Sequence, residues 1–249
     1  MSSPLSFSRF LASPPGQQLS QWEAEHYALE TQGAFGTDAL QVGLPDLDCL
    51  AQCSIPRHWM CTSSEKHAMN VGEGRLPVVA SPAQLPFGGE SFELVCLPHT
   101  LDKTREPQQV LREAARVLCP EGRLIITVFN PMSLWWFRQK MVSLGARAYL
   151  PTQVSPIHPL RLKDWLGLLG FQIERGYWGH YTPSCYTQAA FSRWSWLNKA
   201  GDRWAPHCAN FYMLSAVKRL PGIKLVGKID AIKRGAAQLI QKPSRCPTP

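Results

Sequence analysis

The chain has 249 residues, of which 45% are hydrophobic, enough to bury the core of one large domain or two small ones. No run of 18 apolar residues occurs, which argues against a transmembrane helix. The first 15 residues lack a basic start followed by an apolar core, so no secretory signal is expected and a cytoplasmic protein is the default.

The net charge of +8 is concentrated in a C-terminal tail, residues 219–249. From Ala216 onward there are eight basic residues and one acid, Asp230, so the rest of the chain is nearly neutral. Interleaved apolar residues predict a basic amphipathic helix over Lys228–Ile240 that could contact an anionic membrane surface. A solvated tail is the alternative, and nucleic acid is the disfavoured acidic partner.

Eight cysteines are present, but none forms a CxxC pair. Cys49 and Cys53 are four residues apart, with no second pair and no histidine cluster to complete a zinc site. Reduced thiols and no metal are therefore expected.

The predicted elements begin after an irregular, Ser/Pro-rich N-terminal arm at residues 1–15. Apolar spacing predicts a helix over Gln17–Thr31, ended by Gly33. Strands and helices then alternate, and Pro77 in the last of them suggests a sheet edge. The expected ranges are a strand at Asp38–Leu44, a helix at Asp46–Cys53, a strand at Arg57–Thr62, a helix at Glu65–Asn70 and a strand at Leu76–Ala80.

The clearest pattern lies in Ser81–Phe129, which is expected to form a βαβ unit. Its strands, Ser91–Leu97 and Arg123–Phe129, are apolar almost throughout, as in parallel strands covered on both faces. Between them, Glu106–Leu118 has the 3–4 spacing of a helix with one buried face.

After Asn130 the composition changes, and seven of the nine tryptophans fall between residues 131 and 207. Helices are expected at Ser133–Leu144, Leu162–Leu169 and Gln188–Asn198, and strands at Phe171–Tyr177 and Asn210–Lys218. The alternation predicts an α/β fold: a Rossmann-like doubly wound sheet, mostly parallel, with an antiparallel last strand. It would occupy residues 16–218, with 131–207 as additions on the substrate side.

The βαβ unit resembles class I S-adenosylmethionine-dependent methyltransferases of the methyltransferase type 11 group. The matching residues are Leu85-Pro86-Phe87, Glu90–Val95, His99, Glu106-Pro107, Leu111–Glu113, Arg116–Leu118, Pro120 and Gly122–Leu124. The resemblance implies S-adenosyl-L-methionine as cofactor and a small, apolar molecule as methyl acceptor.

The resemblance also locates the cofactor site, where this sequence departs from the family pattern. Gln41 stands where the first strand normally ends in an acid, and Gly43 is the glycine that remains of the following loop. Ser63 lies near the second acidic position, and Ser81 with Pro82 replaces an Asp-Ala pair. The expected cofactor-binding residues are Gln41, Gly43, Leu44, Ser63, Ser81, Pro82, Ala83 and Leu97.

His99 follows the second strand of the βαβ unit and is the catalytic candidate, as a general base. A histidine bonded only within its own loop is the alternative. The expected substrate-binding residues are Asn130, Trp135, Trp136, His180 and Tyr181, with the tryptophans forming an apolar lid or simply core. The predicted function is methyl transfer, and the alternative is an inactive binding or scaffold protein on the same fold.

Overall fold

The computed structural model describes residues 6–69, 72, 74–144, 149–151, 154–183, 193–194, 196–204 and 206–219. These form a seven-stranded sheet in the order β3-β2-β1-β4-β5-β7-β6. Strands β1 to β5 pair in parallel, and β7 runs antiparallel to both neighbours. The predicted Rossmann-like sheet is confirmed. The strands are β1 Asp38–Val42, β2 Arg57–Thr62, β3 Arg75–Val79, β4 Phe92–Pro98, β5 Leu118–Phe129, β6 Phe171–Gly179 and β7 Phe211–Lys218.

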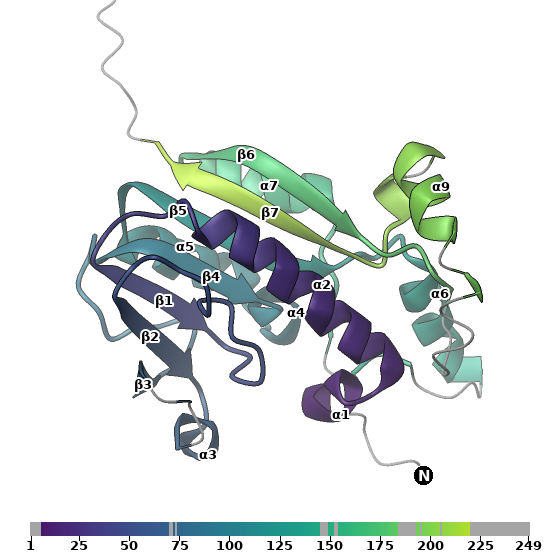
Figure 1. The fold of residues 1–249 in the computed structure, drawn as a ribbon, viewed down its shortest axis with the longest axis horizontal. Coiled ribbons are helices and arrows are strands. Elements are labelled where there is room, and N and C mark those ends of the chain that lie inside the picture. The colour runs from purple at the N-terminus through teal and green to yellow at the C-terminus, as the bar shows by residue number, and fades with distance from the viewer. Residues whose placement is uncertain are drawn as a thin grey trace, which may run out of the picture.

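Helices cover both faces of the sheet (Figure 1). The long helix α2 crosses one face, and α5 and α7 lie on the other. The helices are α1 Phe7–Leu11, α2 Pro14–Thr31, α3 Glu65–Ala68, α4 Thr100–Lys103, α5 Pro107–Val117, α6 Leu134–Lys140, α7 Pro159–Leu168 and α9 Trp196–Trp204, with 3-10 turns at Met141–Leu144 and Pro206–Cys208. None of these helices has the length and apolarity that crossing a membrane requires.

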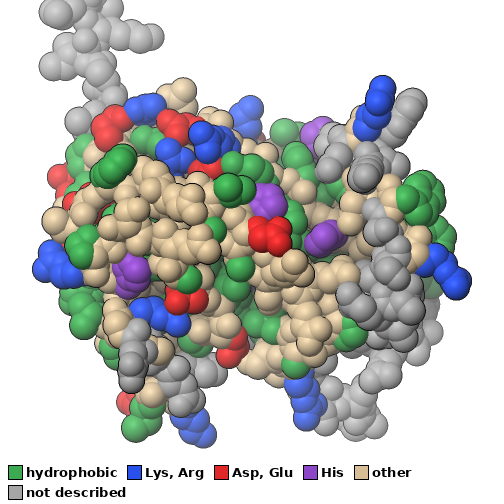
Figure 2. All heavy atoms as spheres, in the orientation of Figure 1, with side chains coloured by type: hydrophobic (Ala, Val, Ile, Leu, Met, Phe, Trp, Pro, Cys, Tyr) green, Lys and Arg blue, Asp and Glu red, His purple; other side chains and the backbone are tan. Residues whose placement is uncertain are grey.

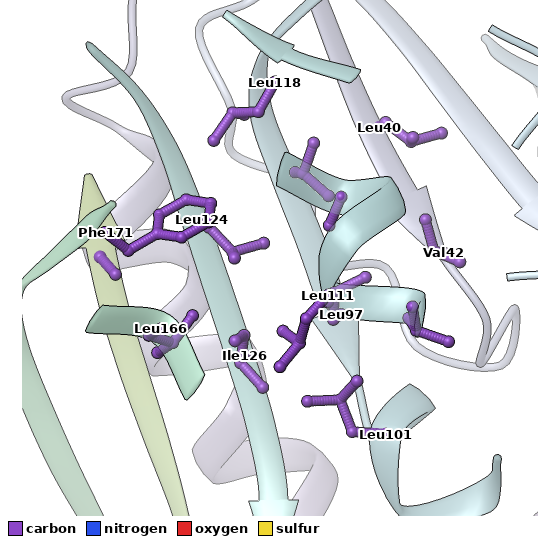
Figure 3. Close-up of a cluster of buried hydrophobic side chains, with 14 of the residues drawn as sticks. Leu40, Val42, Leu97, Leu101, Leu111, Leu118, Leu124, Ile126, Leu166 and Phe171 are labelled. Atoms are coloured by element: carbon purple, nitrogen blue, oxygen red, sulfur yellow. The ribbon is translucent and has the colours of Figure 1, made fainter. Parts of the chain in front are cut away.

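Side chains along each central strand alternate between two cores. Leu40 and Val42 of β1 face the core beneath α5 and α7, as do Leu97 of β4 and Ile126 of β5 (Figure 3). The intervening residues, such as Ala39, Leu94, Cys96 and Ile125, face the core beneath α1 and α2. Gln41 and His99 lie next to this second core, on the face of the sheet that α2 covers.

The structure corrects two predicted elements and contains helices that were not predicted. Phe7–Leu11 is helical rather than irregular, because the hydroxyl of Ser6 caps it by accepting from the backbone of Arg9. Asp46–Cys53 forms turns rather than a helix. Helix α4, after β4, was not predicted, and α9 shares only its first three residues with a predicted helix. The predicted helix at Gln188–Asn198 lies largely outside the described residues, and the helix predicted at Lys228–Ile240 lies wholly outside them.

The remaining predicted elements agree with the structure to within four residues at their ends, except that β5 begins at Leu118, five residues before the predicted strand. Arg57–Thr62 is predicted without error, and Pro77 lies in β3 at the edge of the sheet. The helix predicted at Gln17–Thr31 begins three residues earlier, at Pro14, because proline is well suited to the first turn.

An ion network fixes the C-terminal end of α2 to β5 and β6. The buried carboxylate of Glu30 accepts from Arg123 at 2.8 Å, Arg175 at 3.1 Å and Tyr177 at 2.7 Å. Burial alone would raise the pKa of Glu30, but hydrogen bonds from Ser215, Tyr177 and Arg175 hold it below its ordinary value. The mixture of acidic and basic side chains at the upper left of Figure 2 lies over this end of the sheet. The network fixes the position of α2 along the sheet. It therefore also fixes where the residues toward the other end of α2 lie.

Candidate functional site

The loop after β1 is held closed by the side chain of Gln41. Its Nε2 donates to the carbonyl oxygens of Leu44 at 3.0 Å and Leu47 at 2.6 Å. Its Oε1 accepts from the backbone of Cys49 at 3.0 Å. Gln41 is fully buried, and Leu44 is itself a core residue with a φ of 46°. These bonds explain why the segment is not the predicted helix: its backbone groups are paired with a side chain instead.

Gly43 marks the closest approach between this loop and the end of β4. Its φ is 77°, and a Cβ at this position would lie 2.8 Å from Oγ1 of Thr100. The Thr100 hydroxyl donates to the carbonyl oxygen of Val42 and lies 3.2 Å from that of Pro98. The backbone conformation and the lack of space therefore both call for glycine.

Ser81 and Ala83 line a polar groove of about 1560 Å³ beside the ends of β3 and β4. Ser81 Oγ accepts from Ala83 N at 3.3 Å, and Pro82 between them is half-buried. Ser63 is exposed at the end of β2, and Leu97 is buried in the core beneath α5. The cofactor residues predicted from the sequence are thus divided: Gln41 lies in β1 and Gly43 and Leu44 in the loop after it, whereas Ser81 to Ala83 lie at the groove.

The charges of this groove are mainly positive. Its lining includes one carboxylate, Glu106, and four cationic side chains, which are Lys103, Arg105, Arg112 and Arg161. A concave surface with this balance raises the local concentration of anionic groups.

A buried cluster of charges lies on the other side of the β4 end. His99 Nδ1 is 2.7 Å from Asp102 Oδ2, and His99 Nε2 is 3.3 Å from Glu23 Oε1. All three side chains are fully buried. Burial alone would lower the pKa of His99, but Glu23 and Asp102 raise it to about 9. His99 therefore carries a proton at neutral pH, and a role as general base, which stays a prediction, would require it to lose that proton first.

Several polar atoms of this cluster have no hydrogen-bond partner among the described residues. They are both carboxylate oxygens of Glu23, Nε2 of His99 and Oδ1 of Asp102. The contact between Glu23 and His99 is an ion pair without hydrogen-bond geometry. An unpaired buried polar atom costs roughly 1–3 kcal/mol. The cluster is therefore more polar than folding alone requires.

Helix α1 covers this cluster. The ring of Phe7 lies 5.4 Å from that of His99, and the ammonium of Lys103 lies 3.9 Å from the centre of the Phe7 ring. Ser8 Oγ donates to Asp46 Oδ2 at 3.0 Å, which joins α1 to the loop after β1. These contacts among Phe7, Ser8, Asp46, His99 and Lys103 close the carboxyl ends of β1 and β4.

The expected substrate-binding residues lie near one another, but most of their polar groups are hydrogen-bonded within the fold. Asn130 Nδ2 donates to the carbonyl oxygens of His207 and Ala209, and Trp135 Nε1 donates to that of Thr182. Trp135 is fully buried and Trp136 partly buried. His180 contacts Asn198 at 3.1 Å, and the backbone of Tyr181 donates to Asn198 Oδ1 at 2.9 Å. Trp135 in particular occupies the core rather than a lid.

Sequence reasoning missed Glu23 and Asp102. The signal for Glu23 was present, because Leu19, Glu23 and Tyr27 follow one another at steps of four, which places an acid on the buried stripe of α2. Asp102 lies three residues after His99, but the short helix α4 that brings them together was not predicted.

Residues 57–126 match a family model described as a methyltransferase domain. This part of the chain is therefore similar to methyltransferase domains. The matched residues run from β2 into β5, so they include the edge strand β3 but not β1. No group of three or more histidine, cysteine, aspartate or glutamate side chains suited to a metal ion occurs among the residues that the structure describes.

A protein of Escherichia coli (strain K12), named Uncharacterized protein YafS, is 36% identical over 171 residues. The match covers 67% of this chain and 62% of that protein, so the chain accounts for less than two thirds of its relative's length.

Solved structures share the fold at low sequence identity. One is a chain from the Haloferax volcanii complex between the Trm112 methyltransferase activator and a methyltransferase, with a TM-score of 0.62, 14% identity, and coverage of 88% of this chain and all of that one. Another is an S-adenosylmethionine-dependent methyltransferase from Mesorhizobium loti, with a TM-score of 0.55, 17% identity, and coverage of 80% and 97%. At these identities the likeness concerns the fold.

The residues at the carboxyl ends of the strands fit the amino-acid end of S-adenosylmethionine better than its ribose. Unpaired carboxylate oxygens of Glu23 and Asp102 lie beside the end of β4 and suit a ligand that carries positive charge. At the end of β2, by contrast, Ser63 and Ser64 offer hydroxyl groups rather than the family's acid.

Proposed function

We propose that this chain is an S-adenosylmethionine-dependent methyltransferase that acts on a small acceptor with an apolar body. The observation that carries the proposal is the methyltransferase-domain match over residues 57–126, in a sheet whose carboxyl edge holds unpaired buried carboxylates. The cofactor supplies a methyl group already activated on a sulfonium. The protein then contributes to the reaction by positioning the acceptor and excluding water, and this requires few specialised residues.

An apolar pocket beside the groove supports the acceptor class. It has a volume of about 760 Å³, within the usual range for small-molecule sites, and lies between α7 and strands β6 and β7. Its apolar lining includes Phe171, Ile173, Trp178 and Leu214. His158 lines both this pocket and the polar groove. An acceptor could therefore keep its body in the pocket and extend a polar, anionic end toward the groove.

Isothermal titration calorimetry of the full chain with S-adenosylmethionine and S-adenosylhomocysteine tests the proposal. Saturable binding of both is expected. Binding should also raise the free energy of unfolding, by about 2.7 kcal/mol when the ligand concentration is a hundred times the Kd. Absence of heat and of any stabilisation at millimolar concentrations of both ligands would contradict the proposal.

The alternative is a binding or scaffold protein on the same fold without the cofactor. It is favoured by the side chain of Gln41, whose donors and acceptor are bonded within the loop, and by Thr100, which packs against Gly43. Under this alternative the protein unfolds cooperatively at a midpoint that neither ligand moves. A shift of that midpoint with either ligand would exclude it.

A further inference from the structure

The carboxylate of Glu23 is a charge for which the described fold offers no full partner. Glu23 is an interior residue of α2 and its side chain has no exposed surface. Neither carboxylate oxygen accepts a hydrogen bond from a described residue. Its ion-pair partner, His99, is shared with Asp102, which is equally buried and also retains an unpaired oxygen. Both unpaired carboxylates belong to the same cluster, so a single ligand could satisfy them.

Two cations lie near this cluster. Lys103 interacts electrostatically with Asp102, Asp46 and Glu23, and His99 contributes the second positive charge. Asp46 is exposed and accepts from Ser8, and burial raises the pKa of Asp102. The unpaired oxygens of Glu23 and Asp102 suit a ligand group that is positive and donates hydrogen bonds.

Glu23 reaches the place where β1 lacks an acid. Gln41 Oε1 accepts from the backbone of Cys49, and the thiol of Cys49 interacts with Tyr27 and Glu23 of α2. Gln41 itself is neutral and its amide is bonded within the loop. Cys49 thus links the clamped loop after β1 to the buried stripe of α2, and Glu23 is the acid in that stripe that interacts with Cys49.

We propose that Glu23 binds the positively charged end of the cofactor and so replaces, from helix α2, the acid that is missing at the end of β1. This inference rests on the proposed function. Helix α1 covers the cluster through Phe7 and is held by Ser8 and Lys103. Because Glu23 is fully enclosed, α1 must move aside for the cofactor to enter and can then close over it.

Calorimetry with three ligands tests the proposal. S-adenosylmethionine carries a sulfonium and an ammonium, S-adenosylhomocysteine only the ammonium, and 5′-methylthioadenosine neither. The proteins are the full chain, Glu23→Gln, and the control Glu25→Gln, which removes an exposed carboxylate from the same helix. The quantity compared is the ratio of the Kd of 5′-methylthioadenosine to that of each charged ligand, which is insensitive to a general loss of stability.

Glu23→Gln should lower this ratio at least tenfold, while Glu25→Gln leaves it within twofold. A fall for both charged ligands assigns Glu23 to the ammonium, and a fall for S-adenosylmethionine alone assigns it to the sulfonium; either supports the proposal. An unchanged ratio, including equal weakening of all ligands, overturns it and leaves Glu23 a structural residue. If Glu23→Gln does not fold, Glu23→Asp takes its place with an expected fall of at least threefold, and an unchanged ratio is again decisive. Failure of the full chain to bind any charged ligand counts against the proposed function instead.

Discussion

Restoring the family's acid at the end of β1 should harm the protein. In Gln41→Glu the side chain keeps its shape and can still accept from Cys49, but it loses the donors that bind the carbonyl oxygens of Leu44 and Leu47. The carbonyl oxygen of Leu47 is then unpaired, and that of Leu44 keeps only the bond from the backbone N–H of Leu47 at 3.2 Å, while both face a carboxylate. Because one unpaired buried group costs about 1–3 kcal/mol, the free energy of unfolding should fall by roughly 1–3 kcal/mol or more.

The loss should also depend on pH. Burial and the facing carbonyl oxygens raise the pKa of the introduced carboxyl, so the folded state holds its proton more tightly than the unfolded state does. The free energy of unfolding of Gln41→Glu should therefore decrease as pH rises from 5 to 8, relative to the unmodified chain. Protonation at low pH restores one donor, which is why the difference is smaller there.

Urea unfolding at several pH values measures both effects. The matched control is Gln52→Glu, an exposed position whose Oε1 accepts from Gln32 and keeps that bond after the change. The control should lie within about 0.5 kcal/mol of the unmodified chain. If Gln41→Glu is as stable as the control at pH 8, or binds S-adenosylmethionine more tightly than the unmodified chain, the assigned role of Gln41 as a clamp of the loop is refuted.

Three further changes test other parts of the account. The pKa of His99 rises from 6.5 to about 9 on folding, so His99 should stabilise the protein by about 3 kcal/mol below pH 6.5, and this contribution is lost as pH rises through 9. In urea titrations, the free energy of unfolding of His99→Gln should lack this loss. A pH profile identical to that of the unmodified chain would contradict the buried ion cluster. Gly43→Ala should destabilise the chain by about 1–3 kcal/mol through its positive φ and the Thr100 hydroxyl, and thermal unfolding equal to that of Gly33→Ala, where no atom lies within 4 Å, would argue against that contact. Truncation at Leu220 should abolish sedimentation with anionic liposomes, and equal binding by both forms would refute a membrane role for the basic tail.

The sequence was sufficient for the sheet because its strands obey local rules. The apolar runs in β4 and β5 predict buried parallel strands, and Pro77 indicates the edge position of β3. The buried face of α5 follows from the spacing of Val110, Leu111 and Ala114. These features depend on neighbours within one element, so they can be recognised without knowledge of the fold.

The site was less predictable because it depends on contacts between distant segments. The helix expected at Asp46–Cys53 gave way to turns when Gln41, several residues earlier, paired with its backbone groups. The role of Glu23 becomes visible only when α2 is laid against the end of β4, next to His99. Trp135 was assigned to a lid or the core by composition alone, and only its hydrogen bond to Thr182 and full burial decide between them.

Hydrogen–deuterium exchange with and without S-adenosylmethionine tests most directly the proposed position of the cofactor. The account predicts added protection in α1, in the loop from Gly43 to Leu50, and around His99, with α1 changing most because it closes over the ligand. Protection confined to the groove lined by Arg112 and Arg161, or no protection at a saturating ligand concentration, would contradict a cofactor site between α2 and the carboxyl ends of β1 and β4.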